Sequence, residues 1–261
     1  MHPNLFPTTV LCILIVLIFS INVPTTLCLD DFHYTNCSQN FDCSGIETVN
    51  YPFWGVNRPD YCGLPGFEVT CQDDVPMITM MQGEYRVINI ASATSTLQVA
   101  REDYWGNICP QYFYNTTLNF SLFNYASGLM NLTIFYKCNL YQEIPNVPSA
   151  LSCPINGTNI NAYYAVTGST AVQGLRVMCN SSVIVPIFES VAQALVAGST
   201  NIFDALDEGF ELQWRPSNDQ CNTCMVSGGQ CGYNRTSSQF TCFCKDQPSN
   251  AAVCSSKPSG M

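Results

Sequence analysis

The stretch Met130–Cys138 (MNLTIFYKC) decides the predicted fold, because its apolar side chains recur at every second position. Strict alternation of this kind predicts a β-strand with one buried and one solvent-facing side. The predicted buried side carries Met130, Leu132, Ile134, Tyr136 and Cys138, and the predicted solvent side carries Asn131, Thr133 and Lys137.

The same alternation extends to both sides of this strand. It predicts four further strands, at Tyr85–Ile90, Thr96–Arg101, Leu118–Leu122 and Gly209–Arg215. In the third of these, Phe120 is expected to point inward and Asn119 outward. The sequence therefore predicts a mainly β protein.

Two short helices interrupt the strand pattern. Ser190 and Gln193 have the spacing of a capping box, and Gly198 is suited to end the helix that follows. The segment Asn201–Gly209 predicts a second short helical turn, in which Asp204 complements the positive end of the helix.

Proline and polar residues mark a boundary in the middle of the chain. Pro145, Pro148 and Pro154 lie close together and suggest a linker, which we place at residues 141–152. We expect two disulfide-rich β modules, at residues 29–140 and 153–254, with one or two short helices in the C-terminal module. Residues 255–261 are predicted to form an unstructured tail.

The N-terminus carries an apolar run, Val10–Ile21 (VLCILIVLIFSI), that is short for a membrane span but typical of a signal peptide. We predict a signal peptide at residues 1–28, the alternative being an uncleaved anchor helix. Cys12 and Cys28 lie in this segment, so 14 of the 16 cysteines remain in the mature chain. An even number of cysteines in an exported chain predicts a disulfide framework.

The cysteines predicted to be bridged are Cys37, Cys43, Cys62, Cys71, Cys109, Cys138, Cys153, Cys179, Cys221, Cys224, Cys231, Cys242, Cys244 and Cys254. The last six are expected to pair among themselves, because a long cysteine-free gap separates them from the others. The pairs Cys221/Cys224 and Cys242/Cys244 have spacings that also occur in zinc and redox sites. In an oxidising compartment three structural disulfides are the better interpretation, and no metal site is predicted.

Sequons for N-glycosylation agree with an extracellular address. Asn119, Asn131 and Asn180 are expected to be occupied, because the predicted strands turn them away from the core. The full set is Asn36, Asn115, Asn119, Asn131, Asn156, Asn180 and Asn234.

Charge and composition exclude several functions. The formal net charge is −10 and the nine Lys and Arg residues are scattered, which argues against a nucleic-acid partner. The mature chain holds one histidine, His33, so a catalytic triad is not expected. The adjacent carboxylates Asp73-Asp74 and Glu102-Asp103 would point to opposite faces of a strand, whereas a glycosidase needs two that face each other. No enzyme activity is predicted.

The order of the short motifs carries a family resemblance. C-S-Q-N-F-D-C-S-G begins at Cys37, and Y-P-F-W-G (Tyr51–Gly55), C-G-L-P-G-F (Cys62–Phe67) and T-L-Q-V-A-R (Thr96–Arg101) follow. A C-x2-C-x6-C-G-Y-x8-C-x-C-x9-C pattern closes the chain from Cys221. The first block resembles the galacturonan-binding domain of plant wall-associated receptor kinases. The last resembles the C-terminal wall-associated kinase domain of leaf-rust-resistance-type receptor-like kinases, here without the kinase.

The resemblance implies that the chain binds cell-wall pectin or oligogalacturonide in the plant apoplast. Tyr51, Phe53 and Trp54 could stack on sugar rings, or they could form a core plug. Arg58 and Arg101 could bind uronate carboxylates, or they could pair with Asp60 and Asp103.

Three further expectations follow from the resemblance. A calcium ion could bridge the acidic protein to an anionic ligand, although no EF-hand loop is present, and we expect no other cofactor. A membrane receptor is a second candidate partner, and the cell-surface membrane is the expected location if the chain is part of a longer receptor. The alternative function is that of a protein- or peptide-sensing ectodomain without sugar binding.

Overall fold

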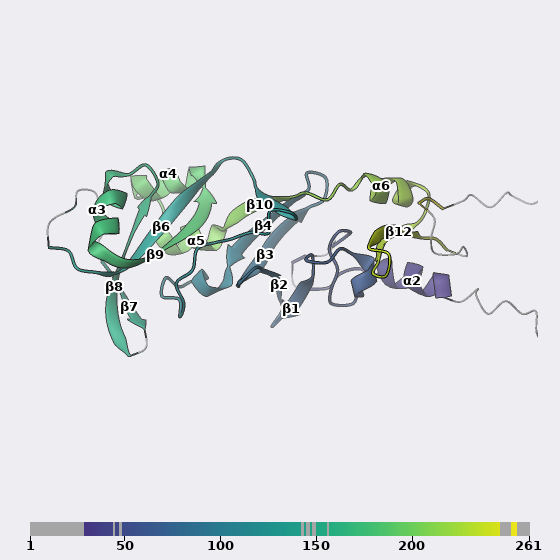
Figure 1. The fold of residues 1–261 in the computed structure, drawn as a ribbon, viewed down its shortest axis with the longest axis horizontal. Helices are drawn as coiled ribbons and strands as arrows, with labels where there is room; N and C mark the ends of the chain where they lie inside the picture. Colours follow the sequence, from purple (N-terminus) through teal and green to yellow (C-terminus); the bar gives the residue numbers. More distant parts are fainter. Residues whose placement is uncertain are drawn as a thin grey trace, which may run out of the picture. The chain divides into compact units, whose positions relative to one another are not determined.

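The computed structural model describes residues 29–43, 45–46, 49–141, 144, 147, 150–155, 157–245 and 252–254. The predicted signal peptide, the predicted tail and the sequon at Asn156 lie outside these residues. The described residues form two compact units: one within residues 39–218, and a second that combines residues up to 38 with residues from 219 onward (Figure 1). Among the described residues, no helix is both long enough and apolar enough to span a membrane.

The first sheet of the larger unit has six strands in the order β1-β2-β3-β4-β10-β5, and all neighbours are antiparallel. Its inner face packs on a core that contains Phe53, Phe67, Tyr85, Phe210 and Trp214. Its strands are β1 (Val69–Gln72), β2 (Val75–Met80), β3 (Gly83–Ala91), β4 (Thr96–Arg101), β5 (Phe123–Tyr125) and β10 (Phe210–Trp214).

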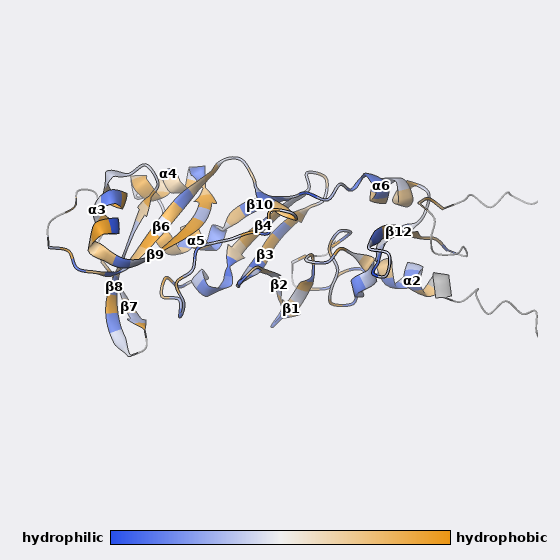
Figure 2. Ribbon diagram, viewed as in Figure 1, coloured by the Kyte–Doolittle hydropathy of each residue, from blue (hydrophilic) through white to orange (hydrophobic). Residues whose placement is uncertain are grey.

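The second sheet of this unit has four antiparallel strands in the order β7-β8-β6-β9. Helices α4 and α5 contribute to the core on one face of the sheet, and α3 covers part of the other face. Hydrophobic residues dominate β6 and β9, as their orange colour shows (Figure 2). The elements are β6 (Leu129–Cys138), β7 (Leu151–Ile155), β8 (Thr158–Val166), β9 (Cys179–Phe188), α3 (Thr170–Met178), α4 (Glu189–Ala197) and α5 (Ile202–Glu208).

The mainly β prediction is confirmed, and four of the five predicted strands correspond to β3, β4, β6 and β10. The prediction for Leu118–Leu122 is wrong. Leu118 is buried, but Phe120 is 56% exposed, and the strand begins only at Phe123. Asn119 accounts for the difference, because its Oδ1 accepts hydrogen bonds from the Ser121 amide and hydroxyl and closes a turn.

The prediction that one face of β6 meets solvent also needs correction. Thr133 and Phe135 are buried, with exposed fractions of 5% and 1%. Phe135 packs with Ala171 and Leu175 of α3, which lies over this face. The apolar residues of α3 are spread over nine positions and interrupted by Gly174, so the local pattern did not predict a helix over β6.

The strand pairing does not follow the predicted division at residues 141–152. Strand β6, before this segment, pairs with β8 and β9, which follow it. Strand β7 begins at Leu151, inside the segment, and β10 returns to the first sheet between β4 and β5. Alternation identifies strands but not their partners, because pairing joins residues far apart in the sequence.

Helices α4 and α5 confirm the two predicted helical segments. Gly198 ends α4 in the left-handed conformation, at φ 71° and ψ 18°, as expected. The predicted capping box is wrong, because α4 begins at Glu189 and Ser190 already lies inside the helix. Asn201 caps α5 by accepting hydrogen bonds from the amides of Phe203 and Asp204.

The smaller unit contains α2 (Leu29–Cys37), α6 (Asp219–Val226) and a hairpin of β11 (Gln230–Asn234) and β12 (Gln239–Phe243). The last six cysteines pair among themselves, which confirms that prediction. The pairs are Cys221–Cys231, Cys224–Cys242 and Cys244–Cys254.

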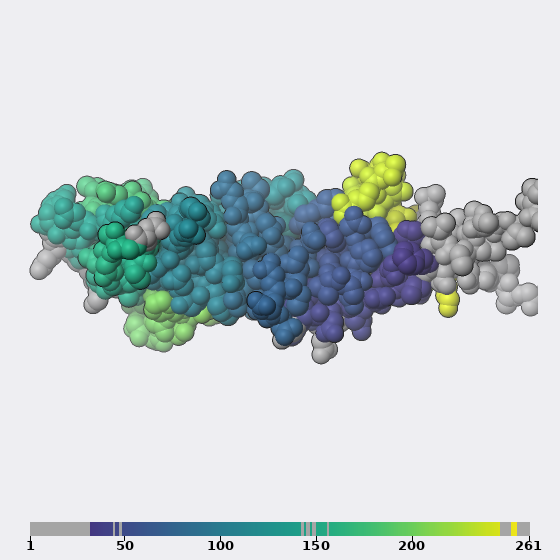
Figure 3. Space-filling model, turned by 90° about the horizontal axis from the view of Figure 1, so that it is seen from below, coloured from purple at the N-terminus to yellow at the C-terminus, as the bar shows by residue number. Residues whose placement is uncertain are grey.

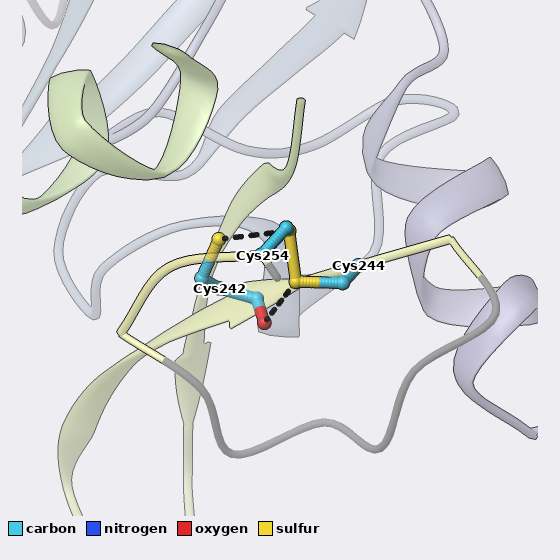
Figure 4. Close-up of side chains that lie close together, drawn as sticks. All are labelled: Cys242, Cys244 and Cys254. Atoms are coloured by element: carbon cyan, nitrogen blue, oxygen red, sulfur yellow. Dashed lines mark hydrogen bonds between the residues drawn. A yellow bond between two sulfur atoms is a disulfide. The ribbon is translucent and has the colours of Figure 1, made fainter. Parts of the chain in front are cut away.

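The sulfurs of this unit are packed tightly. Sγ of Cys242 lies 3.7 Å from Sγ of Cys254 in the neighbouring disulfide (Figure 4). A Cβ added at Gly229 would lie 2.4–2.7 Å from the Sγ atoms of Cys242, Cys224 and Cys254. Position 229 therefore has no room for a side chain.

The remaining eight cysteines are also bridged. The disulfides are Cys43–Cys71, Cys109–Cys153 and Cys138–Cys179, and Cys37 and Cys62 are disulfide-bonded as well. The predicted disulfide framework of fourteen cysteines is confirmed.

Candidate ligand-binding face

Trp54 is held beside β1 at the edge of the first sheet. Its backbone N–H donates to the Phe67 carbonyl (3.2 Å) and its carbonyl accepts from the Val69 amide (2.8 Å). Its indole Nε1 donates to the Leu64 carbonyl at 2.8 Å. Because backbone and side chain are both hydrogen-bonded, the half-buried indole has a fixed orientation.

Two glycines allow this close approach. A Cβ at Gly63 would lie 2.8 Å from Cδ1 of Trp54 and 2.4 Å from the Pro52 carbonyl oxygen. Gly55 has φ +129°, and a Cβ there would lie 1.9 Å from the Val69 carbonyl oxygen. The glycines of Y-P-F-W-G and C-G-L-P-G-F therefore keep the indole against β1.

Next to Trp54, strands β1 and β2 form a shallow hollow of about 140 Å³. Thr70 lies directly opposite Met77, and the same register places Glu68 beside Thr79, so these four side chains share one face of the ribbon. The residues that line the hollow are Trp54, Gly66, Glu68, Thr70, Met77 and Thr79. An indole next to hydroxyl and carboxylate groups can pack on the C–H face of a sugar ring while those groups hydrogen-bond to its hydroxyls.

The same face continues on β3. Glu84 lies opposite Thr79, and Arg86 lies opposite Met77. Arg86 forms a two-pronged ion pair with Glu102 and lies 4.5 Å below the centre of the exposed Trp105 ring. We call the surface formed by Trp54, Glu68, Thr70, Met77, Thr79, Glu84 and Arg86 the Trp54 face. In Figure 3 the blue atoms, which belong to the part of the chain that includes β1, β2 and β3, form a continuous surface.

Phe53 and Tyr51 belong to the interior, and this corrects their assignment as ligand contacts. Phe53 is 0% exposed and packs edge-on against Phe67 and Trp214, with ring centres 5.3 and 5.0 Å apart. Tyr51 is 7% exposed. Consecutive side chains of an extended segment point to opposite sides, so Trp54 reaches the surface while Phe53 fills the core.

Arg101 is a structural residue in this fold, which corrects its assignment as a uronate contact. Its guanidinium binds both carboxylate oxygens of Asp103, at 3.0 and 2.7 Å, and donates to the Tyr114 carbonyl at 2.8 Å. It lies between the Tyr104 and Tyr114 rings, 4.8 and 4.2 Å from their centres. Burial alone would lower the pKa of Arg101, but the hydrogen bonds and charge of Asp103 raise it overall.

Arg58 is also buried, at 5% exposed, and its assignment as a ligand contact is corrected in the same way. Its Nη1 donates to the Gln39 carbonyl at 3.1 Å, and its backbone forms a bridge with Gly55. Loss of hydration lowers the pKa of Arg58 to about 10. The buried guanidinium connects Gln39 to the Trp54 loop rather than meeting solvent.

The sequence reasoning missed Glu68, Thr70, Thr79 and Arg86 as members of the face. A signal for the first two was present, because polar Glu68 and Thr70 alternate with apolar Phe67, Val69 and Cys71. What the sequence could not show is that β1, β2 and β3 are neighbours, which brings these side chains beside Trp54.

Most of the described sequon asparagines are exposed. Asn119, Asn131 and Asn180 are exposed, as predicted, although Asn119 lies in a turn rather than in the predicted strand. Asn115 is exposed as well, and its Oδ1 accepts a hydrogen bond from the Ile184 amide. Asn36 and Asn234 are half-buried. No sequon occurs between residues 37 and 114, so β1 to β4 carry none.

Two segments of the chain match known protein families. Residues 37–101, which contain Trp54 and β1 to β4, match the family of the wall-associated receptor kinase galacturonan-binding domain. Residues 152–247 match the wall-associated receptor kinase C-terminal domain. The chain belongs to the wall-associated kinase ectodomain type. Neither matched family is a kinase domain.

The relatives of this wall-associated kinase ectodomain are receptor-like kinases of Arabidopsis thaliana. The chain is 28% identical over 252 residues to leaf rust 10 disease-resistance locus receptor-like protein kinase-like 2.5, covering 90% of this chain and 37% of that protein. It is 30% identical over 230 residues to kinase-like 2.8 (82% and 25%) and 32% identical over 203 residues to kinase-like 2.4 (77% and 31%). The chain thus spans about a third of the length of these relatives or less. No solved structure matches it significantly.

Proposed function

We propose that this chain is an extracellular, glycosylated module that binds cell-wall pectin through the Trp54 face. The carrying observation is the hollow between Trp54 and the ribbon of β1 and β2, in which a fixed indole lies beside the exposed hydroxyls of Thr70 and Thr79. Sugar rings present apolar C–H faces and hydroxyl edges, which match these two kinds of group. The absence of sequons from β1 to β4 leaves this surface open to a large polymer.

The test is binding of pectic oligosaccharides to the mature, oxidised protein by isothermal titration calorimetry. Trp54→Ala should abolish binding, because it removes the only aromatic side chain that lines the hollow. Since Trp54 is half-buried, this variant also loses packing, and a second variant is required. Thr70→Tyr keeps the strand and fills the hollow, so it should weaken binding at least tenfold with unchanged thermal stability.

Asn161→Tyr is the matched control. Asn161 is an exposed strand residue of β8 in the second sheet, outside any sequon, and the new ring should leave binding unchanged. Equal binding by wild type, Thr70→Tyr and Asn161→Tyr would move the pectin site away from the Trp54 face. Absence of binding by the wild type to every pectic fragment would refute the proposed function.

A different cavity favours the second candidate function, recognition of a protein or peptide. It measures about 360 Å³, within the size range of small-ligand sites, and lies where β8, the start of α3 and the end of α4 meet. No charged side chain lines it; the lining residues are Tyr164, Ala165, Val166, Ser169, Thr170, Leu195 and Val196. Crosslinking of the chain to a membrane receptor that Val196→Glu abolishes, with pectin binding absent, would favour this function.

A further inference from the structure

The charges of the Trp54 face are mostly negative. Glu68, one residue before β1, and Glu84 in β3 are exposed and flank Thr79 of β2 on either side, so two carboxylates stand in one row. Two strand spacings separate them, which is about 10 Å. Glu102 adds a third carboxylate beside Arg86, the one cation of the face.

This cation is already engaged. Arg86 uses both prongs of its guanidinium on Glu102, with Nη2 and Oε1 3.0 Å apart, and its flat side faces Trp105. A uronate that approached Arg86 would have to displace Glu102 while lying near Glu84. The other two cations of the matched galacturonan-binding segment, Arg58 and Arg101, are buried and cannot supply positive charge to the hollow.

The hollow itself is suited to an uncharged ring. At about 140 Å³ it is smaller than the roughly 300–1,000 Å³ of sites that enclose a whole small molecule, so it can receive part of a polymer. Trp54 and the largely buried Met77 form its apolar side, and the exposed Thr70 and Thr79 offer hydroxyl groups. A methyl ester fits the apolar side of this site, whereas a free carboxylate would lie near Glu68 without a positive partner.

We infer that the Trp54 face selects uncharged, methyl-esterified galacturonosyl residues over free galacturonate. The inference rests on the proposed function, because it specifies the form of pectin that this same site binds. Recognition is by stacking and neutral hydrogen bonds, and a stretch of free uronates is rejected by the carboxylates around the hollow.

The experiment compares two galacturonan oligomers of equal length, one fully methyl-esterified and one fully de-esterified, by calorimetry with the mature protein. Titrations are run at low and at physiological salt, in EDTA and in calcium. The esterified oligomer should bind at least tenfold more tightly in all four conditions, with little dependence on salt. The de-esterified oligomer should bind better as salt rises, because salt screens its repulsion from Glu68 and Glu84.

Charge-neutral variants test the cause. Glu68→Gln and Glu84→Gln should each improve binding of the de-esterified oligomer about two- to threefold, the effect of one surface charge several ångströms away in water. Binding of the esterified oligomer should not change. Glu208→Gln, at an exposed position at the end of α5, is the matched control and should alter neither affinity.

The outcomes separate the inference from the proposed function. Tighter binding of the de-esterified oligomer, whether in EDTA or only in calcium, overturns the inference and leaves pectin binding in place. In the calcium case, a bridging ion would join the carboxylates of protein and ligand. Failure of both oligomers to bind would refute the inference together with the proposed function.

Discussion

Replacement of Arg101 by alanine tests the conclusion that this residue stabilises the fold rather than contacting a ligand. The Arg101 side chain is 1% exposed, whereas Asp103 retains 25% exposure. The substitution removes two hydrogen bonds to Asp103 and one to the Tyr114 carbonyl. It also removes the cation that lies between the Tyr104 and Tyr114 rings.

The expected loss of stability is large. Breaking a buried ion pair by removing one partner costs about 3–5 kcal/mol, and the partial exposure of Asp103 favours the lower part of this range. We expect about 3 kcal/mol for Arg101→Ala, which is a large share of the roughly 5–15 kcal/mol that stabilises a typical domain. Arg101→Lys keeps the charge but loses the planar fork, so it should cost about half as much.

The assay is urea unfolding of the oxidised protein, followed by tryptophan fluorescence. Arg86→Ala is the matched control, because its ion pair with Glu102 is partly exposed and should contribute less than about 1 kcal/mol. If Arg101→Ala were no more destabilising than Arg86→Ala, the structural assignment of Arg101 would be refuted. Its earlier interpretation as a ligand contact would then return.

Three further predictions concern other parts of the molecule. Gly229→Ala should cause mispaired cysteines in non-reducing peptide maps, because its Cβ would clash with three sulfurs. Gly228→Ala strains the backbone at φ +84° but meets no atom within 4 Å, so it should pair correctly. In a eukaryotic secretory host, single Asn→Gln changes should each remove one amidase-sensitive step in gel mobility if made at Asn119, Asn131 or Asn180. Burial raises the pKa values of Tyr104 and Tyr136 above the unfolded value of 10. Their stabilisation is therefore complete below pH 10 and is lost above it, by about 1.4 kcal/mol per pH unit for each tyrosine. Simultaneous rises in tyrosinate absorbance and unfolding would confirm this, and titration of both tyrosines without unfolding would contradict it.

The elements of this fold were more predictable than their arrangement. Alternation identified β3, β4, β6 and β10, and Gly198 and Asn201 identified the ends of two helices, because these signals lie within a few consecutive residues. The partners of β10 were not predictable, since no residue pattern near Phe210–Trp214 indicates the strands with which it pairs. The burial of Phe135 likewise depends on α3, which lies more than thirty residues further along the chain.

For the candidate site as well, the sequence predicted candidate residues but not where the fold places them. The Y-P-F-W motif and the arginines were recognised from the sequence, but their exposure was not. Trp54 and Phe53 are adjacent and both aromatic, yet one reaches the surface and the other fills the core. Arg101 was assigned two alternative partners, a uronate or Asp103, and only its contacts in the folded chain, with Asp103 and the Tyr114 carbonyl, distinguish between them.

The position of β10 between β4 and β5 governs how this chain can fold while it is being synthesised. The edge of β4 stays without its partner from the time residue 101 is made until residue 210 is made. At about 5–20 residues per second, synthesis from residue 102 through residue 210, which is 109 residues, takes roughly 5–20 s. The strands of the second sheet, which span residues 129–188, are all made within that interval. The second sheet can therefore form before the first, and the edge of β4 is an open strand edge, of the kind that favours aggregation, until β10 arrives.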